Sequence, residues 1–144
     1  RGPWLVRERE RATVERVRGE LDIRMADPDR PITSLSGGNQ QKAVVARALL
    51  TSPRVLLMDE PTRGIDVAAR GEMFALMHRL AGQGLAVLYS SSDLKEVVGL
   101  ADRVVVLSNG RVTGEFDGHT ISEQELVEAS YVGHVTEAGD EHEG

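Results

Sequence analysis

The stretch VLLMDEPT, residues 55–62, decides the fold of this chain. Its first four residues are apolar and follow Pro53, and two adjacent carboxylates, Asp59 and Glu60, come directly after them. A short, continuous apolar run bounded in this way predicts a fully buried strand of a parallel sheet. Because ligands bind at the carboxyl ends of the strands in open α/β sheets, the two carboxylates are candidate functional residues.

Two neighbouring carboxylates at a strand end suit phosphate chemistry. Asp59 can hold a magnesium ion through water, and Glu60 can orient or deprotonate an attacking water. The same pair also fits a strand that simply runs into a polar loop, so the dipeptide alone leaves both interpretations open.

A second cluster, LSGGNQQK at residues 35–42, precedes this strand. Ser36 is a good N-cap for a helix, and the N–H groups of the first helical turn have no partner within the helix. Gly37 and Gly38 lack a Cβ, which lets a phosphate approach the backbone. The alternative is an ordinary capped helix with a flexible entry.

Apolar periodicity and turn residues outline the rest of the chain. Pro28 and Pro31 interrupt helical structure, and Asn109-Gly110 predicts a hairpin turn. Helices are predicted over 4–25, 36–50, 67–82, 92–100 and, capped by Ser122, 121–131; further strands are predicted over 85–89, 104–107 and 111–113. Alternating helices and strands predict an α/β fold with a mainly parallel sheet.

Composition narrows the classes of protein further. The 144 residues suffice for one domain, and the net charge of −6 argues against a general nucleic-acid binder. The chain has no cysteine, which excludes disulfides, Cys-ligated zinc and thiol catalysis. We expect no signal peptide, and the 144 residues contain no apolar run long enough for a membrane span. Because the chain begins with Arg1 rather than Met, we expect an internal piece of a longer protein.

Together the two clusters resemble the nucleotide-binding domains of ABC ATPases. Residues 35–38 (LSGG) are similar to the signature motif of that family, and residues 55–60 are similar to its Walker B strand with the catalytic glutamate. Gly64-Ile65-Asp66 stands in the place of the D-loop. The resemblance covers about residues 14–116 and implies the ABC ATPase form of the P-loop NTPase fold.

Finer features resemble one subfamily. LSGGNQQK, with Asn39 where most members have Gln, and DEPTRGIDVAAR at residues 59–70 look like the second nucleotide-binding domain of fused ATPases. Those ATPases serve bacterial monosaccharide importers of the ribose, galactose and xylose type. Ser92 stands where the family normally has its switch histidine. The resemblance therefore implies that the second ATP site turns over slowly or only binds.

The resemblance also implies a role for each matching residue, with ATP and Mg²⁺ as cofactors. Glu60 is the expected general base, Asp59 the magnesium ligand through water, and Asp66 the D-loop residue that communicates across a dimer. The nucleotide-binding residues, which complete a site whose P-loop lies in another domain, are Ser36, Gly37, Gly38, Asn39 and Gln40.

The family's P-loop, GxxxxGK[ST], does not occur in the 144 residues. The only lysines are Lys42 and Lys95, and neither lies in a glycine loop. We therefore expect a partial domain that is inactive alone, with the P-loop strand missing between residues 85–89 and 104–107. The expected parts are the end of a helical subdomain (1–52), the second half of the ATPase core (53–132) and a disordered acidic tail (133–144).

The function implied is that of the ATP-binding and hydrolysing subunit of a sugar ABC importer, peripheral to the cytoplasmic face of the membrane. The expected partners are a first nucleotide-binding domain in the same or a second subunit, a transmembrane permease and, indirectly, a sugar-binding protein, with no nucleic acid. Two alternatives remain: a soluble ABC ATPase acting on ribosomes or DNA, and a half-domain that acts only as a non-catalytic scaffold.

Overall fold

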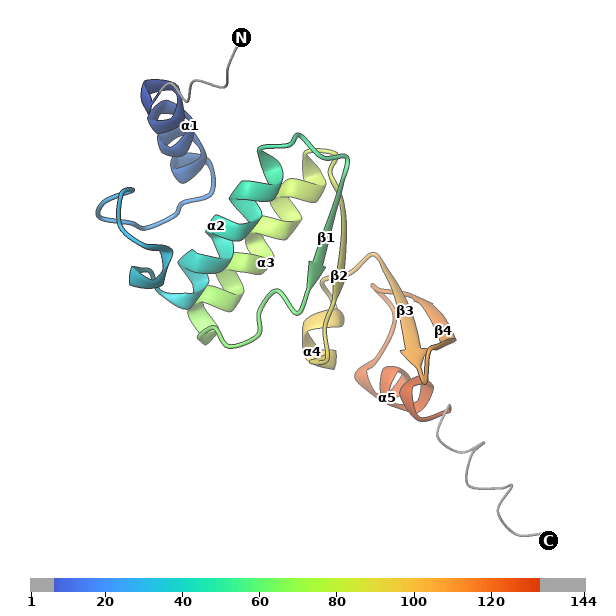
Figure 1. Ribbon diagram of the computed structural model, residues 1–144. Helices are drawn as coiled ribbons and strands as arrows, with labels where there is room; N and C mark the ends of the chain where they lie inside the picture. The colour runs from blue at the N-terminus through green and yellow to red at the C-terminus, as the bar shows by residue number, and fades with distance from the viewer. Residues whose placement is uncertain (1–6, 133–144) are drawn as a thin grey trace, which may run out of the picture. The chain divides into compact units, whose positions relative to one another are not determined.

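The computed structural model describes residues 7–132. They form two compact units, of which the first ends at Ser90 and the second begins at Ser91. The unit that ends at Ser90 contains three longer helices and a parallel strand pair (Figure 1). The predicted disorder of residues 133–144 lies outside the described residues. The predicted subdomain boundary at residue 52 stays a prediction.

The first unit has the predicted order of helices and strands. Its elements are α1 (Arg7–Glu20), the short 3-10 helix η1 (Ile32–Ser34), α2 (Gly37–Leu49), β1 (Val55–Asp59), α3 (Val67–Gly82) and β2 (Ala86–Ser90). β1 and β2 pair in parallel, so that Asp59 at the end of β1 lies opposite Ser90. α2 and α3 lie side by side, and α3 packs against β2. The core residues of these two helices are Val45, Ala46, Met73, Leu76, Met77 and Leu80.

The first helix ends earlier than predicted, at Glu20 rather than near residue 25. Asp22 adopts a left-handed conformation with φ of 48°. Its N–H donates to the Gly19 carbonyl at 3.4 Å, and the Ile23 N–H donates to the Arg18 carbonyl at 2.9 Å. These two bonds form a Schellman termination, usually made by glycine. With aspartate in that position, the end of the helix carries no clear sequence signal.

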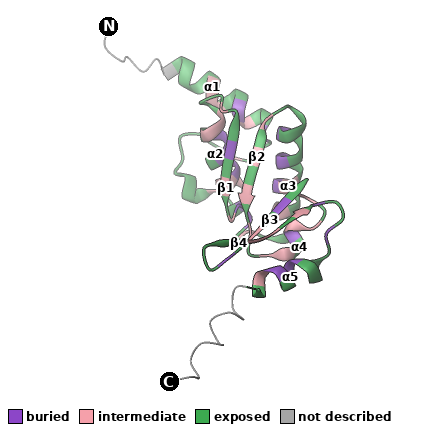
Figure 2. Cartoon of the chain, turned by 90° about the vertical axis from the view of Figure 1, so that its right-hand side faces the viewer, coloured by how far each residue is buried: buried purple, intermediate pink, exposed green. Residues whose placement is uncertain are grey.

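The prediction of fully buried strands is wrong. Leu56 is buried at 5% exposure, whereas Val55 and Leu57 on the same strand are 53% and 70% exposed, and Leu88 on β2 is 64% exposed (Figure 2). Successive side chains point to opposite faces of a strand. Among the described residues of this unit, helices pack against only one face of the strand pair, so the apolar residues on the other face are open.

The second unit consists of α4 (Leu94–Val97), β3 (Arg103–Ser108), β4 (Arg111–Asp117) and α5 (Glu123–Tyr131). β3 and β4 are antiparallel, and the positive φ angles of Asn109 and Gly110 at their turn confirm the predicted hairpin. β4 extends to Asp117, beyond the predicted residue 113. The buried core residues are Val104, Ile121 and Leu126.

Both helices of this unit have local capping signals. Ser122 caps α5 as predicted, in a capping box with Glu125, and its N–H and hydroxyl hold the pKa of Glu125 below the ordinary value. α4 ends at Val97 rather than at residue 100. Gly99 follows this end with φ of 80°, a conformation that does not continue a helix.

α2 and α3 approach each other closely at Gly38. A Cβ built on Gly38 would lie 2.5 Å from the Cβ of Ala69, which is far inside normal contact distance. Gly38 is buried, so the only direction a side chain could take leads into α3. The distance between the two helices therefore requires glycine at this position.

Gly38→Ala is expected to lower the free energy of unfolding by about 1–3 kcal/mol, because the added methyl overpacks this contact. Gly71→Ala on α3 is the matched control, since a Cβ there meets nothing within 4 Å. It is expected to raise stability by up to about 1 kcal/mol through helix propensity. Urea unfolding followed by circular dichroism measures both. Equal effects of the two substitutions would contradict the packing constraint.

Candidate functional site

The N-terminus of α2 carries the first candidate site. Ser36 is the N-cap, as predicted, but its side chain makes no capping bond to a backbone N–H group. Its Oγ instead accepts a hydrogen bond from Nδ2 of Asn39 at 2.8 Å. The N–H groups of the first turn have no partner within a helix, so these donors remain available to an anion, and the helix dipole favours one.

The two glycines of this turn face the loop that leads into α3. A Cβ on Gly37 would lie 3.3 Å from Cγ2 of Ile65, and one on Gly38 would meet Ala69. The structure thus brings together two of the predicted clusters, residues 36–38 and residues 64–66. It also adds a packing reason for the glycines to the predicted one, which was the close approach of a phosphate.

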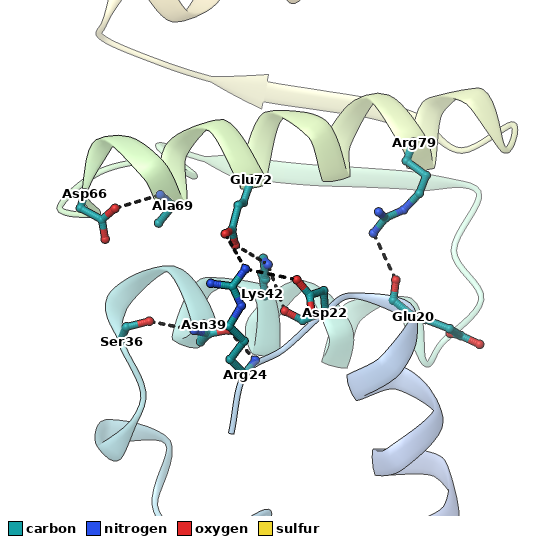
Figure 3. A network of polar contacts seen from close by, with 10 residues as sticks. All are labelled: Glu20, Asp22, Arg24, Ser36, Asn39, Lys42, Asp66, Ala69, Glu72 and Arg79. Carbon is teal, nitrogen blue, oxygen red and sulfur yellow. Dashed lines mark hydrogen bonds and ion pairs between the residues drawn. The ribbon is translucent and has the colours of Figure 1, made fainter. Parts of the chain in front are cut away.

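Asp66 begins α3. Its Oδ1 accepts a hydrogen bond from the N–H of Ala69 at 2.9 Å, which is the usual bond of an aspartate N-cap. Figure 3 shows Asp66 and Ser36 at the same end of the α2–α3 pair. The aspartate therefore has a structural role in this chain in addition to the role that the resemblance implies.

A charged network joins α2, α3 and the segment after α1 (Figure 3). Nζ of Lys42 lies 2.8 Å from Oε2 of Glu72 and donates to the carbonyl of Asp22 at 3.1 Å. Arg24 donates to Oε1 of Glu72 at 3.0 Å. The Lys42 ammonium, and after it the Arg24 guanidinium, hold the pKa of the Glu72 carboxyl below its ordinary value.

The sequence analysis missed this network. The side chain of Lys42 is only 5% exposed, and lysine is almost never buried unless it is paired. The available signal was the position of Lys42 in the apolar stripe of α2, between Gly38 and the buried Val45. A lysine in such a stripe indicates an acidic partner close to it, although it does not say which acid.

The amide side chains of Asn39 and Gln40 are used within the chain. Oδ1 of Asn39 accepts from the N–H of Arg24 at 2.8 Å, and Nε2 of Gln40 donates to the carbonyl of Leu35 at 2.8 Å. Ser36 and Asn39 line an open cleft of about 290 Å³, whose charged lining residues are Arg24, Arg30 and Asp27. This cleft can receive an anionic group beside the helix N-terminus.

The carboxyl end of β1 carries the second candidate site. Oδ1 of Asp59 accepts a hydrogen bond from the hydroxyl of Ser90, and the N–H of Glu60 donates to the Ser90 carbonyl at 3.1 Å. Glu60 has a left-handed backbone with φ of 46°, a strained conformation for a non-glycine residue that is typical of functional sites. Pro61 and Thr62, which follow, are buried and hold the turn in place.

The donor set at this strand end fits magnesium. Asp59 is exposed, and carboxylate oxygens are the ligands that Mg²⁺ prefers when it keeps several of its waters. Glu60 is half-buried beside it, so its carboxylate lies at the same strand end without being sequestered in the core. The strand pair therefore presents both predicted carboxylates together.

Ser92 lies in the second unit. Its neighbour Ser91 donates to the buried Glu96 at 2.8 Å and accepts from the N–H of Asp93 at 3.1 Å. Within residues 7–132, no three His, Cys, Asp or Glu side chains form a group that could hold a metal ion. No helix in that part of the chain is long and apolar enough to cross a membrane.

Comparison with known proteins agrees with this geometry. The family model of the ABC transporter matches residues 5–63. A xylose import ATP-binding protein of Pseudomonas syringae pv. tomato is 48% identical over 123 residues, which are 85% of this chain and 23% of that protein. A ribose import ATP-binding protein of Rhizobium meliloti is 47% identical over 129 residues, which are 89% of this chain and 25% of that protein.

Solved structures give the same result for the fold. A dimeric ATP-binding cassette in a post-hydrolysis state, bound to ADP and Pi, matches 84% of this chain and 52% of its own with a TM-score of 0.68 and 25% identity. The fold is thus that of a P-loop NTPase of the ABC ATPase type, of which the chain covers part. The chain belongs to the ATP-binding domains of ABC transporters, and it spans about a quarter of the length of the curated relatives it matches.

Glu72→Gln is expected to lower the free energy of unfolding by about 1–2 kcal/mol at pH 7, because it removes the charge that bonds to two cations. The effect is no larger because solvent partly screens these bonds. The folded-state pKa of Glu72 is lowered. Its contribution is therefore complete above the unfolded pKa of about 4.3 and is lost as the pH falls through the lower folded value.

Urea unfolding of both proteins between pH 7 and pH 3 measures this gap, which should narrow only below about pH 4. Glu115→Gln is the control, because it removes the exposed ion pair with Arg103 and should change stability by less than about 0.5 kcal/mol. A gap of constant size over the whole pH range would contradict the role of the Glu72 charge.

Proposed function

We propose that this chain is part of the ATP-binding and hydrolysing subunit of an ABC importer for a monosaccharide. The observation that carries the proposal is the N-terminus of α2, where Ser36 makes no capping bond and lines a cleft with Asn39, two arginines and Asp27. The names of the relatives, which are xylose and ribose import proteins, support a sugar as the cargo.

At this site Ser36, Gly37 and Gly38 bind the γ-phosphate of an ATP whose P-loop belongs to the opposite domain. Backbone N–H groups and the helix dipole stabilise negative charge there without rearrangement, which favours phosphoryl transfer. Asn39 and Gln40 belong to the same site. Because their amides bond to other groups of the chain, they support the turn rather than the phosphate.

The end of β1 serves the other ATP site. The Glu60 carboxylate accepts the proton of the attacking water, and Asp59 holds Mg²⁺ through water. When bound, the metal ion neutralises charge on the phosphate oxygens. Asp66 is held as the N-cap of α3, at the same end of the α2–α3 pair as Ser36. It communicates between the two ATP sites across the dimer.

Three partners belong to this proposal. One is the first nucleotide-binding domain of the same or a second subunit, which supplies the P-loop facing Ser36. Others are a transmembrane permease and, through it, a sugar-binding protein, with the subunit peripheral to the cytoplasmic face of the membrane. The dimer of the solved cassette supports such pairing, and the net charge of −6 agrees with the absence of a nucleic-acid partner.

Glu60→Gln in the intact subunit is expected to lower the rate of ATP hydrolysis by about 10²–10⁴-fold, because the general base is lost, while ATP still binds. Phosphate release and nucleotide binding measure the two effects. Glu123→Gln, at an exposed glutamate of α5, is the control and should leave hydrolysis unchanged. Full activity of the Glu60 variant would remove Glu60 from the mechanism.

Ser92→His tests the second ATP site. Serine has no imidazole to contact the γ-phosphate, so we propose that the ATP site to which Ser92 belongs turns over slowly. Restoring histidine is expected to raise the ATP turnover of the intact subunit. An unchanged turnover would show that the residue at position 92 does not limit that site.

A further inference from the structure

We propose that Asn39 is a positioning residue that directs the hydroxyl hydrogen of Ser36 away from α2 and toward the bound phosphate. The inference rests on the proposed function, because it concerns how the Ser36 turn presents its donors. It is carried by the bonds that Asn39 makes to Ser36 and to Arg24.

A serine N-cap normally accepts a hydrogen bond from the backbone N–H of the second or third helical residue. Here the amide Nδ2 of Asn39, at the third position, takes the place of that backbone donor. The backbone N–H group that a capping bond would have used is therefore kept for an anion. The Ser36 hydroxyl hydrogen is a second donor, and it points away from Asn39 because Oγ acts as the acceptor toward that residue.

The bond to Arg24 decides which way the Asn39 amide faces. A backbone N–H can only donate, so the atom of Asn39 that lies 2.8 Å from it must be the oxygen. The NH₂ group then necessarily faces Ser36. A primary amide supplies one acceptor and one donor in this arrangement, whereas a carboxylate supplies two acceptors. In the Asn39→Asp variant the serine hydroxyl would donate to the carboxylate and would no longer be available to donate to the phosphate.

The segment that carries the Arg24 N–H is itself held in place (Figure 3). The Arg24 side chain donates to Glu72 on α3, and the Asp22 carbonyl accepts from the buried Lys42 on α2. The N–H that orients Asn39 is thus anchored to both helices. A chain of polar contacts leads from Glu72 through Arg24 and Asn39 to Ser36.

The experiment measures kcat/KM for ATP in the full-length subunit that contains this chain. The variants are Asn39→Asp, Asn39→Ala, Ser36→Ala and the double variant Ser36→Ala/Asn39→Ala. Asn109→Asp is the matched control, because Asp-Gly forms the same hairpin turn as Asn-Gly. Affinity for ADP, which has no γ-phosphate, and the thermal midpoint are measured for every variant.

Loss of one hydrogen bond to a charged phosphate corresponds to about a 10- to 100-fold fall in kcat/KM, which is expected for Ser36→Ala. In Asn39→Asp, kcat/KM should fall at least as far. In Asn39→Ala it should fall less, because Oγ of Ser36 can then accept the usual capping bond from a backbone N–H group. ADP affinity and the thermal midpoint should stay the same, and the double variant should match Ser36→Ala alone. The Asn109→Asp control should match the unmodified protein.

Two results would overturn the inference. One is a normal kcat/KM of the Asn39→Asp variant. The other is that Asn39→Ala lowers kcat/KM by the same factor with Ser36→Ala already present as without it, which would show that Asn39 acts independently of the serine. If Asn39→Asp does not fold, the comparison of Asn39→Ala with the double variant decides. A Ser36→Ala variant with normal activity would instead count against the proposed function.

Discussion

The close packing of α2 on α3 is the constraint on which the candidate site depends. The contact between Gly38 and Ala69 sets how near the helices lie, and the Lys42–Glu72 ion pair joins the same two helices further along. Because interiors are close-packed, such a contact leaves little freedom for the elements on either side. The turn at Ser36 therefore has a defined position relative to the loop before α3.

The Ser36 side chain bonds to the Asn39 amide instead of capping the helix. An ordinary serine cap would stabilise the helix but use a donor that an anion needs. Asn39 satisfies Ser36 from the side, and Arg24 satisfies Asn39. At the end of β1, Glu60 similarly keeps a strained backbone, which its bond to Ser90 holds in place. Both candidate sites thus depart from the locally most stable arrangement, Ser36 by its missing capping bond and Glu60 by its positive φ.

Much of the fold could be predicted because its signals are local. The cap at Ser122 and the Asn109-Gly110 turn are each contained within a few residues, and the apolar pattern of each helix or strand lies within that element. The end of α1 could not be predicted, since Asp22 takes a role usually held by glycine. The exposure of Leu57 and Leu88 was missed because a continuous apolar run does not show whether one or both faces of a strand are covered.

The sequence by itself determined which residues are the candidates for the chemistry: the serine and glycines before a helix, and the paired carboxylates after a strand. Residue type and position relative to a helix or strand end suffice for this. Only the tertiary structure decided that Gly38 is needed for packing, that Lys42 finds Glu72, and that Asn39 accepts from Arg24 while it donates to Ser36. Apart from Ser36, the partners in these contacts lie far apart in the chain, and they meet only through the packing of helices and loops, which no local pattern encodes.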